Sequence, residues 1–414
     1  MTKSINLGII GLGGRGYGLL KSEILRMKDV NIAGVCDSYQ DRAERGLQAV
    51  KKAKGYTPVC STNYKDILSI KEIDGIMITT SWEDHINIAI ECMEKGIFVA
   101  MEVGGAYSIE DCWRLVNTYE RTGTPCMLLE NCCYGKMELA LLNMVRMGIF
   151  GDIVHCAGGY LHDLRYEISN GIKNRHYRLR NYIERNCENY PTHELGPIAK
   201  LLDINRGNRM LTLSSFSSKS RGLHEYIEKY HKDDKELMDT VFKQGDIVTT
   251  VINCERGETI VLTLDTTLPR PYSRGLYIKG TKGMYQEDGN FFYMDNKLSH
   301  KIKHDRQNAL WGNATRFIRK YKHPLWKTEK KLTGHGGMDT LVLRAMVDSI
   351  RTKSLPPIDV YDTASWMAIT ALSEQSIKGG GILIEIPDFT SGNYKDRKDI
   401  SESKFSLDIN KTNK

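Results

Sequence analysis

The first third of the chain alternates short apolar runs with longer amphipathic stretches. The apolar runs have the length and composition of strands that are buried on both faces, and they fall at residues 5–10, 30–36, 75–80, 97–101 and 125–129. The stretches between them predict helices near residues 17–28, 38–52, 85–95 and 108–122. This alternation predicts a doubly wound parallel sheet of the Rossmann type, which we assign to residues 1–133.

The pattern changes after about residue 134. Strand-like runs now follow one another, separated by turn signals such as Glu255-Arg256-Gly257, at residues 152–161, 210–217, 246–254, 258–266, 274–280 and 282–287. We therefore expect residues 134–387 to form an α+β domain with a largely antiparallel sheet, and helices at 338–353 and 360–379. The predicted fold class is α/β with this second domain, and residues 388–414 are expected to form a polar, poorly ordered tail.

Composition narrows the class of protein. A chain of 414 residues can hold two domains, and its 41% hydrophobic and 26% charged residues are ordinary for a soluble globular protein. The formal net charge of +7 is mild, and lysines and arginines are scattered, with denser patches at 299–331 and in the tail. Nucleic-acid binding is therefore not indicated. The ten cysteines include no Cys-x-x-Cys pair, so no metal site is predicted.

The start of the chain and its cysteines bear on its location. Residues 1–4 lead directly into the first strand without a signal-peptide pattern, and no apolar run approaches the ~18 residues of a membrane span. The cysteines Cys36, Cys126, Cys156 and Cys254 fall in predicted strands, where a small buried side chain fits. We therefore expect a cytoplasmic protein with reduced thiols and no membrane contact.

A glycine-rich segment opens the first predicted helix. Gly11-Leu12-Gly13-Gly14-Arg15-Gly16 matches G-x-G-x-x-G directly after a strand. The first glycine allows a tight turn, the second lets a pyrophosphate approach the backbone, and the third lets helix and strand pack closely. Asp37 ends the second strand, where a carboxylate can bind ribose hydroxyls and would repel a 2′-phosphate. The predicted cofactor is therefore NAD.

Two further strand ends belong to the same edge of the predicted sheet. Trp82-Glu83-Asp84-His85 follows the strand at 75–80, and Glu102-Val103 follows the strand at 97–101. Ligands in open α/β sheets bind outside the carboxyl ends of the strands, so both segments should border the cofactor. His85 could equally be a cap residue at the start of its helix.

The segment Tyr190-Pro191-Thr192-His193 presents a tyrosine and a histidine three residues apart, with a rigid proline between them. Beside a nicotinamide, such a pair suggests removal of hydride from a carbon that bears a hydroxyl, with a side chain taking the hydroxyl proton. A second interpretation is that Tyr190 is a loop residue and His193 caps a helix. The four residues alone do not decide between the two.

Together these features resemble the glucose–fructose oxidoreductase/inositol dehydrogenase superfamily. Dehydrogenases of that superfamily usually carry Glu-Lys-Pro where this chain has Glu102-Val103-Gly104, so their catalytic lysine is absent. A narrower resemblance is to glycoside hydrolase family 109, which contains NAD-dependent α-N-acetylgalactosaminidases. It rests on the ordered segments 82–85, Glu102-Val103, Glu130-Asn131-Cys132-Cys133-Tyr134, 159–165, 190–193 and Arg270-Pro271-Tyr272-Ser273-Arg274.

The resemblance to family 109 implies residues for each ligand. It implies cofactor contacts at Gly14, Arg15, Asp37, Trp82, Glu83, Asp84, His85, Glu102, Val103 and Asn131, beside the fingerprint glycines Gly11, Gly13 and Gly16. It implies substrate contacts at Tyr160, Arg178, Tyr190, Pro191, Thr192, His193 and Tyr272. The implied substrate is a glycoside of an N-acetylhexosamine, with α-N-acetylgalactosamine as the first expectation.

NAD-dependent glycosidases are an exception to the rule of two carboxylates that flank the cleaved bond. In their chemistry NAD takes hydride from C3, the ketone acidifies the C2 proton, and the C1 substituent leaves by elimination before water adds and hydride returns. We expect His193 to accept the C3-hydroxyl proton and Tyr160 to remove the C2 proton, although the sequence leaves open which of the two is the C2 base.

Three different functions stay open on the sequence alone. An ordinary glycosidase would need a pair among Asp163, Glu167, Glu184, Glu188 and Glu194, and nothing in the sequence marks two of them as partners. A net sugar oxidoreductase of the same superfamily would consume NAD, and a non-catalytic sensor would only bind NAD or sugar. The second domain could also support a homo-oligomer. The sugar's C4 stereochemistry, the anomer and the aglycone are not fixed by the sequence.

Overall fold

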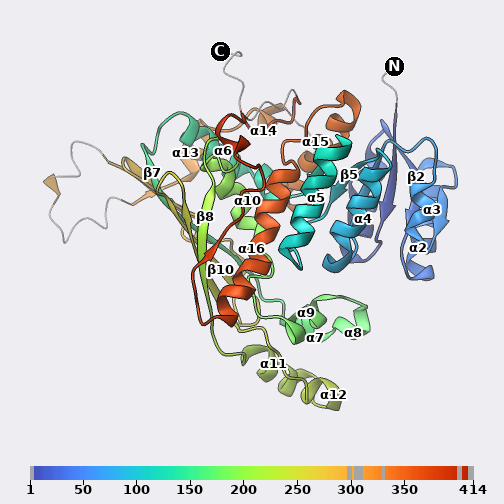
Figure 1. Cartoon of the computed structure of the whole chain (residues 1–414), viewed down its shortest axis with the longest axis horizontal. Coiled ribbons are helices and arrows are strands. Elements are labelled where there is room, and N and C mark those ends of the chain that lie inside the picture. The colour runs from blue at the N-terminus through green and yellow to red at the C-terminus, as the bar shows by residue number, and fades with distance from the viewer. Residues whose placement is uncertain (1–3, 296–300, 303–310, 329–331, 399–402, 409–414) are drawn as a thin grey trace. The chain divides into compact units, whose positions relative to one another are not determined.

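The computed structural model describes residues 4–295, 301–302, 311–328, 332–398 and 403–408, and Figure 1 traces them from blue to red along the chain. The chain folds into two compact units. The first comprises Met1–Gly135, Leu325–Met367 and Asp399–Lys414, and the second comprises Lys136–Pro324 and Ala368–Lys398. Each unit therefore combines distant parts of the chain, whereas the division at residues 133 and 387 predicted from the sequence is linear.

The first unit is built on a six-stranded sheet in which every pair of neighbouring strands is parallel. Its strands are β1 (Ile5–Ile10), β2 (Val30–Cys36), β3 (Val59–Ser61), β4 (Gly75–Ile78), β5 (Phe98–Met101) and β6 (Cys126–Leu128). Five of them confirm the predicted apolar runs. The strand β3, a three-residue edge strand whose side chains are all at least partly exposed, was not predicted from the sequence.

The first unit also contains helices and turns, of which those between β1 and β6 connect its strands. They are α1 (Gly14–Ser22), η1 (Ile24–Arg26), α2 (Gln40–Lys54), α3 (Tyr64–Leu68), α4 (Trp82–Glu94), α5 (Ile109–Thr122), η2 (Asn131–Tyr134), α14 (Leu325–Thr328), η5 (His335–Gly337) and α15 (Met338–Thr352). The ends of α5 show why a helix begins and ends where it does. The Ser108 hydroxyl accepts a hydrogen bond from the Asp111 N–H at the first turn, and Gly123, with a φ of +67°, ends the helix. Helices α4 and α5 lie side by side (Figure 1).

The order of the strands places the ligand-binding edge of this sheet. The order is β3-β2-β1-β4-β5-β6, so β1 pairs with β2 on one side and with β4 on the other. The direction in which the chain adds strands reverses at β1, and open α/β sheets bind ligands at the carboxyl ends of the strands that flank such a point. The segments that follow β1, β2, β4, β5 and β6 therefore share one edge.

The second unit is built on a nine-stranded sheet in the order β14-β13-β12-β11-β7-β10-β9-β8-β15. Its strands are β7 (Ile153–Leu161), β8 (Met210–Ser217), β9 (Ile247–Cys254), β10 (Thr259–Asp265), β11 (Tyr277–Gly280), β12 (Gly283–Gln286), β13 (Phe291–Met294), β14 (Gly312–Asn313) and β15 (Ile384–Glu385). Strands β7 and β10 pair in parallel and the other recorded pairs are antiparallel. This confirms the largely antiparallel sheet, to which the sequence analysis did not assign β13, β14 and β15.

Helices of the second unit carry several of the predicted site residues. They are α6 (Lys136–Arg146), α7 (Arg165–Ser169), α8 (Gly171–Asn174), α9 (Arg178–Glu184), α10 (Thr192–Leu201), α11 (Gly222–Tyr230), α12 (Lys235–Met238) and α13 (Thr315–Lys320). The 3-10 turn η6 (Asn393–Lys395) also belongs here, and α16 (Val360–Lys378) begins in the first unit and ends in the second. The predicted helices at 338–353 and 360–379 are confirmed by α15 and α16.

The tail contains apolar side chains that are buried. Phe389 and Tyr394 are buried in the second unit, and Phe405 and Leu407 in the first. The expectation of poor order was therefore wrong for residues 388–398 and 403–408, because these side chains bury apolar surface between polar neighbours. Residues 399–402 and 409–414 of the predicted tail, and much of the basic patch at 299–331, lie outside the described residues.

None of the ten cysteines forms a disulfide, and every one except Cys60 is buried. Burial raises the pKa of the Cys36 and Cys254 thiols to about 12, so these side chains behave as small hydrophobes, as the sequence suggested. Along the part of the chain that the structure describes, no helix has the length and apolar character needed to cross a membrane.

Candidate functional site

The glycine-rich segment after β1 forms a tight loop against the end of β4. Gly11 has a φ of +97°, a conformation that favours glycine, and its N–H donates to the Cys36 carbonyl at 2.8 Å. A side chain at Gly16 would overlap the Gly11 carbonyl oxygen and the Thr79 hydroxyl, so α1 packs directly on the loop. By contrast, nothing lies within 4 Å of the position that a side chain of Gly14 would take. The loop thus has the close packing and the open face that the fingerprint predicts.

Asp37 connects the ends of β1 and β2. Its Oδ2 accepts from the Leu12 N–H at 2.6 Å and its Oδ1 from the Tyr39 N–H at 3.0 Å, and the residue is buried. A carboxylate has about four acceptor positions, so two hydrogen bonds leave capacity for ribose hydroxyls. Asp37 therefore shapes the loop and can still bind a ligand.

The first turn of α4 carries four of the predicted cofactor residues. The Trp82 indole is buried against Gly104, where any side chain would collide with it. Glu83 is partly exposed, and the exposed Asp84 accepts from the Ser81 hydroxyl at 2.7 Å. These contacts fix the path of the chain between β4 and α4.

His85 is buried beneath this turn. Its Nε2 lies 3.1 Å from the Thr80 carbonyl oxygen, to which it donates, so it does not cap the helix by accepting from a backbone N–H. Burial lowers its pKa to about 4, so the ring is neutral at pH 7. Its Nδ1 is then a buried acceptor without a hydrogen-bond partner among the described residues, which a donor on a bound ligand could satisfy.

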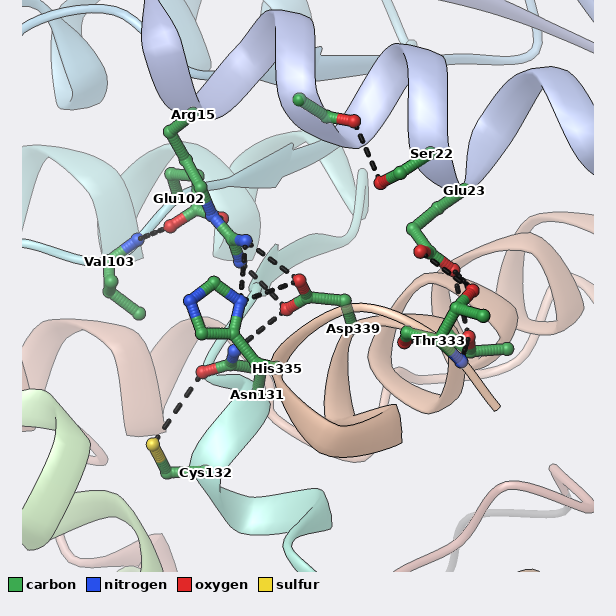
Figure 2. A network of polar contacts seen from close by, with 12 residues as sticks. Arg15, Ser22, Glu23, Glu102, Val103, Asn131, Cys132, Thr333, His335 and Asp339 are labelled. Carbon is green, nitrogen blue, oxygen red and sulfur yellow. Dashed lines mark hydrogen bonds and ion pairs between the residues drawn. The ribbon is translucent and has the colours of Figure 1, made fainter. Parts of the chain in front are cut away.

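Arg15, Glu102, Val103 and Asn131 meet in one polar network (Figure 2). Arg15 Nε lies 2.8 Å from Glu102 Oε1, and Glu102 Oε2 accepts from the Val103 N–H at 3.1 Å. The guanidinium also donates to both carboxylate oxygens of Asp339, at 2.8 and 2.9 Å. The sequence predicted four of these residues and did not point to Asp339.

Asp339 is the centre of this network. It also accepts from Asn131 Nδ2 and from His335 Nδ1, each at 2.7 Å, and its side chain is only 3% exposed. Burial alone would raise its pKa, but the hydrogen bonds from His335 and Arg15 outweigh that effect and lower it. Asp339 therefore stays ionised at neutral pH and holds Arg15 and Asn131 in place.

The segment before α15 explains how Asp339 reaches this position. Gly334, His335, Gly336 and Gly337 all have a positive φ, between +40° and +111°, and α15 begins at the next residue. Glycine lowers the cost of such a backbone. A glycine-rich run directly before an amphipathic helix was the sequence signal that could have drawn attention to His335 and Asp339.

In the second unit, the aromatic side chains predicted to bind substrate form a cluster. Tyr160, at the end of β7, lies with its ring centroid 4.3 Å from that of Tyr190, and the His193 ring lies 4.8 Å from Tyr190 and 5.6 Å from Tyr160. Tyr160 and Tyr190 are buried, whereas His193, in the first turn of α10, is partly exposed. The two predicted catalytic residues, Tyr160 and His193, are thus brought together.

Arg178 adds a buried positive charge to this cluster. Its Cζ lies 5.0 Å from the Tyr190 ring centroid and 5.9 Å from that of Tyr160, and its Nε lies 2.8 Å from Glu167 Oε1. Burial would lower the pKa of Arg178, but the neighbouring tyrosines and Glu167 outweigh it and raise that pKa. A permanent cation here favours the ionised form of a neighbouring phenol.

The remaining predicted substrate residues lie around this cluster. Tyr272 is exposed, and its ring centroid lies 5.1 Å from that of His162, which in turn contacts Tyr160. Pro191 directly precedes α10, and Thr192 is fully buried with a hydroxyl that finds no hydrogen-bond partner in the described part of the chain. That these residues bind a sugar stays a prediction.

The carboxylates that an ordinary glycosidase would need are mostly held by arginines. Arg165 donates to both oxygens of Asp163, which lowers the pKa of that carboxyl, and Glu167 pairs with Arg178. Glu194 is buried near Arg274, with Oε1 3.6 Å from Nε, and Arg274 also pairs with Glu138. Glu184 is exposed. Glu188 is fully buried, which raises its pKa to about 8.

The parallel unit, with its glycine loop and strand-end acid, defines an NAD-binding Rossmann enzyme. The family model described as "Oxidoreductase family, NAD-binding Rossmann fold" matches residues 5–129, and "Glycosyl hydrolase 109, C-terminal domain" matches residues 134–396. The chain therefore belongs to glycoside hydrolase family 109, and it is an NAD-dependent glycosidase.

Related proteins are similar in sequence to almost the whole of this chain. A glycosyl hydrolase family 109 protein of Stenotrophomonas maltophilia is 41% identical over 96% of this chain and 92% of its own length. Two proteins named α-N-acetylgalactosaminidase, from Tannerella forsythia and Shewanella oneidensis, are each 36% identical over 95% of this chain and cover 88% and 87% of their own lengths.

One solved structure shares this fold but has little sequence similarity to the chain. An inositol dehydrogenase homologue from Azotobacter vinelandii, complexed with NADH and myo-inositol, aligns with a TM-score of 0.63 at 14% identity. The alignment covers 92% of this chain and 98% of that one. At this identity, the likeness concerns the fold alone.

Proposed function

We propose that this enzyme removes terminal α-N-acetylgalactosamine from glycosides by temporary oxidation at C3, elimination across C1 and C2, and addition of water. The observation that carries the proposal is the cluster of Tyr160, Tyr190, His193 and Arg178, which combines two groups able to move protons with a buried cation. The choice of sugar is supported by the two relatives that are named α-N-acetylgalactosaminidases.

The residues of the first unit fit the cofactor. The loop Gly11–Gly16 would take the pyrophosphate and Asp37 the adenosine ribose, while His85 offers a buried acceptor to a ligand donor. Arg15, Glu102, Val103 and Asn131 would bind the rest of the cofactor, held in place by Asp339. When bound, NAD supplies a reversible acceptor for the C3 hydride.

Within the second unit, His193 would accept the proton of the C3 hydroxyl and Tyr160 would remove the proton from C2. Arg178 favours the Tyr160 phenolate through its charge. Tyr190, Tyr272 and Arg178 would donate hydrogen bonds to sugar hydroxyls and to the acetamido carbonyl. Thr192 offers one further buried hydroxyl.

The atoms balance in this sequence. Once C3 is a ketone, Tyr160 takes the C2 proton, the C1–C2 double bond forms, and the bond from C1 to the aglycone oxygen breaks. Water then adds its hydroxyl to C1 while Tyr160, whose hydroxyl proton has meanwhile exchanged with solvent, returns a proton to C2. The remaining proton of the water replaces the one gained by the aglycone, so the net reaction is hydrolysis.

The pairing of three of the five candidate carboxylates with arginines supports elimination over direct displacement at C1. Displacement needs a protonated carboxylic acid on one side of the glycosidic bond and a carboxylate on the other side. Asp163 and Glu167 are instead paired with Arg165 and Arg178, and Glu194 lies near Arg274. Such pairing stabilises the ionised form and disfavours the role of general acid.

The proposed function predicts that NAD is recycled rather than consumed. With NAD limiting, many molecules of a chromogenic α-N-acetylgalactosaminide should be cleaved per molecule of NAD, and the β-linked and N-acetylglucosamine analogues should react more slowly. The measurement compares aglycone release with the absorbance of NADH. Equal amounts of oxidised sugar and NADH would replace the glycosidase with a net oxidoreductase, and faster cleavage of another glycoside would correct the sugar.

A further inference from the structure

We infer that His162 is the proton partner of Tyr160, receiving the phenol proton before Tyr160 attacks C2 and returning it after water has added. His162 acts through Tyr160 and is therefore a positioning residue in the reaction. The inference rests on the proposed function, because it assigns a step to the C2 base. The sequence alone did not assign a role to His162.

Strand geometry brings the two side chains together. Tyr160 lies in β7 and His162 follows the end of that strand, so residues two apart point to the same side. The Tyr160 hydroxyl oxygen lies 3.2 Å from His162 Nδ1. In the tautomer that carries its proton on Nε2, the phenol donates to Nδ1, which is the direction that proton removal from Tyr160 requires.

The imidazole of His162 is held in this orientation from both sides. Its ring meets Tyr160 edge-on, with centroids 5.6 Å apart, and meets Tyr272 edge-on at 5.1 Å. Its backbone N–H donates to the Asp265 carbonyl at 2.9 Å, and the neighbouring Leu161 pairs with Ser273. The contact with Tyr160 is therefore fixed by β7 and by the segment that carries Tyr272.

The surroundings of His162 favour the neutral ring that can accept a proton. Burial lowers its pKa, and the charge of Arg178 on α9 acts in the same direction. Glu167 on α7 and the adjacent Asp163 oppose this shift, whereas His193 on α10 adds to it. The net shift is downward, so His162 is unprotonated at neutral pH and can accept the phenol proton.

The proton transfers return Tyr160 and His162 to their starting protonation states without an added reagent. The proton of the Tyr160 hydroxyl moves to His162 Nδ1, which gives a phenolate and an imidazolium. The phenolate takes the C2 proton and becomes a phenol again. The phenol proton then exchanges with solvent. When water has added at C1, the phenol gives a solvent-derived proton to C2, and the imidazolium returns the stored proton to Tyr160. Arg178 stabilises the phenolate during the interval in which it is charged.

The test variant is His162→Asn, whose amide oxygen can accept the hydrogen bond but cannot take the proton. Exchange of the C2 hydrogen in D₂O should fall on the order of 10²-fold. NAD affinity and the amount of enzyme-bound NADH formed on adding substrate should stay at wild-type values. The matched control is His155→Asn on the same strand, because the half-buried His155 bonds to Thr259 Oγ1 at 2.8 Å and should leave exchange unchanged.

The pH profile gives a readout that a purely structural role would not move. In the wild type, we expect the rate of C2 exchange, divided by the amount of enzyme-bound NADH, to decline as the pH falls below the range in which an imidazole ordinarily titrates. The reason is that protonated His162 cannot accept the phenol proton. The His162→Asn variant should lack this decline. Should that variant fail to bind NAD, His162→Gln and the wild-type profile decide the question.

The outcomes separate this inference from the function on which it rests. A rate of C2 exchange in His162→Asn equal to that of the wild type would overturn the role of His162. The same decline of exchange at low pH in that variant would also overturn it, and either result would leave the glycosidase mechanism intact. Cleavage by the wild type with neither C2 exchange nor bound NADH would instead overturn the proposed function.

Discussion

Replacing Tyr160 by phenylalanine should abolish C2 exchange and lower glycoside cleavage by on the order of 10²–10⁴-fold, the usual contribution of a positioned acid–base group. The substitution removes one hydroxyl and keeps the ring, which can still pack against Tyr190 and His193. The residues proposed to bind NAD belong to the other unit, so NAD affinity should not change. The measurements are NMR of the product formed in D₂O and the release of a chromogenic aglycone.

A matched control for this variant is Tyr182→Phe. Tyr182 is a buried tyrosine of the same unit, and its hydroxyl lies 2.5 Å from Thr266 Oγ1. Loss of that hydrogen bond should lower the free energy of unfolding by about 1 kcal/mol and leave C2 exchange intact. Wild-type exchange in Tyr160→Phe would show that another group, with His193 as the first candidate, is the C2 base.

Replacing Asp339 by alanine should lower the free energy of unfolding by about 3 kcal/mol, because removing one partner of a buried ion pair leaves the others without compensation. Arg15 and Asn131 would lose their shared acceptor, while Glu102 would still pair with Arg15. NAD affinity should fall together with stability. Urea unfolding and NAD titration measure the two effects.

The control and the pH dependence sharpen this prediction. The control variant Asp348→Ala alters the same helix at a partly exposed residue, whose carboxylate accepts a hydrogen bond from the Ser403 hydroxyl. This variant should lower the free energy of unfolding much less than Asp339→Ala. The pKa of Asp339 is lower in the folded state than its unfolded value near 3.8. The stabilisation that the ionised carboxylate provides is therefore fully present above pH 3.8 and is lost as the pH falls further. The stability gap between wild type and Asp339→Asn should therefore shrink in acid. A gap that does not depend on pH would contradict the proposed ion-pair network.

Local patterns in the sequence predicted the frame of the first unit well. The runs at 5–10 and 30–36 coincide with β1 and β2, because a continuous apolar run of that length is buried on both faces of a parallel sheet. The fingerprint at Gly11–Gly16 is equally local as a sequence pattern, although Thr79, which follows β4, helps to exclude a side chain at positions 11 and 16. The strand β3 escaped prediction because Val59–Ser61 is short and lies at the sheet edge.

Contacts between distant segments could not be predicted in this way. Arg15 and Asp339 are separated by 324 positions, and nothing in either segment specifies the other. The same holds for Glu194 and Arg274, whose pairing bears on the choice between elimination and displacement. His162 lay within a segment that pointed to family 109, but its role depends on the contact with Tyr160 and on the burial around Arg178.

The most direct test of the proposed elimination is the position of deuterium in the released sugar when the wild-type enzyme works in D₂O. Elimination requires the C2 proton to leave, whereas displacement at C1 never touches it. We expect the released N-acetylgalactosamine to carry deuterium at C2 while unreacted substrate and NAD-free controls carry none beyond background. Rapid cleavage with the original hydrogen retained at C2 would contradict the mechanism and point to a carboxylate pair acting at C1.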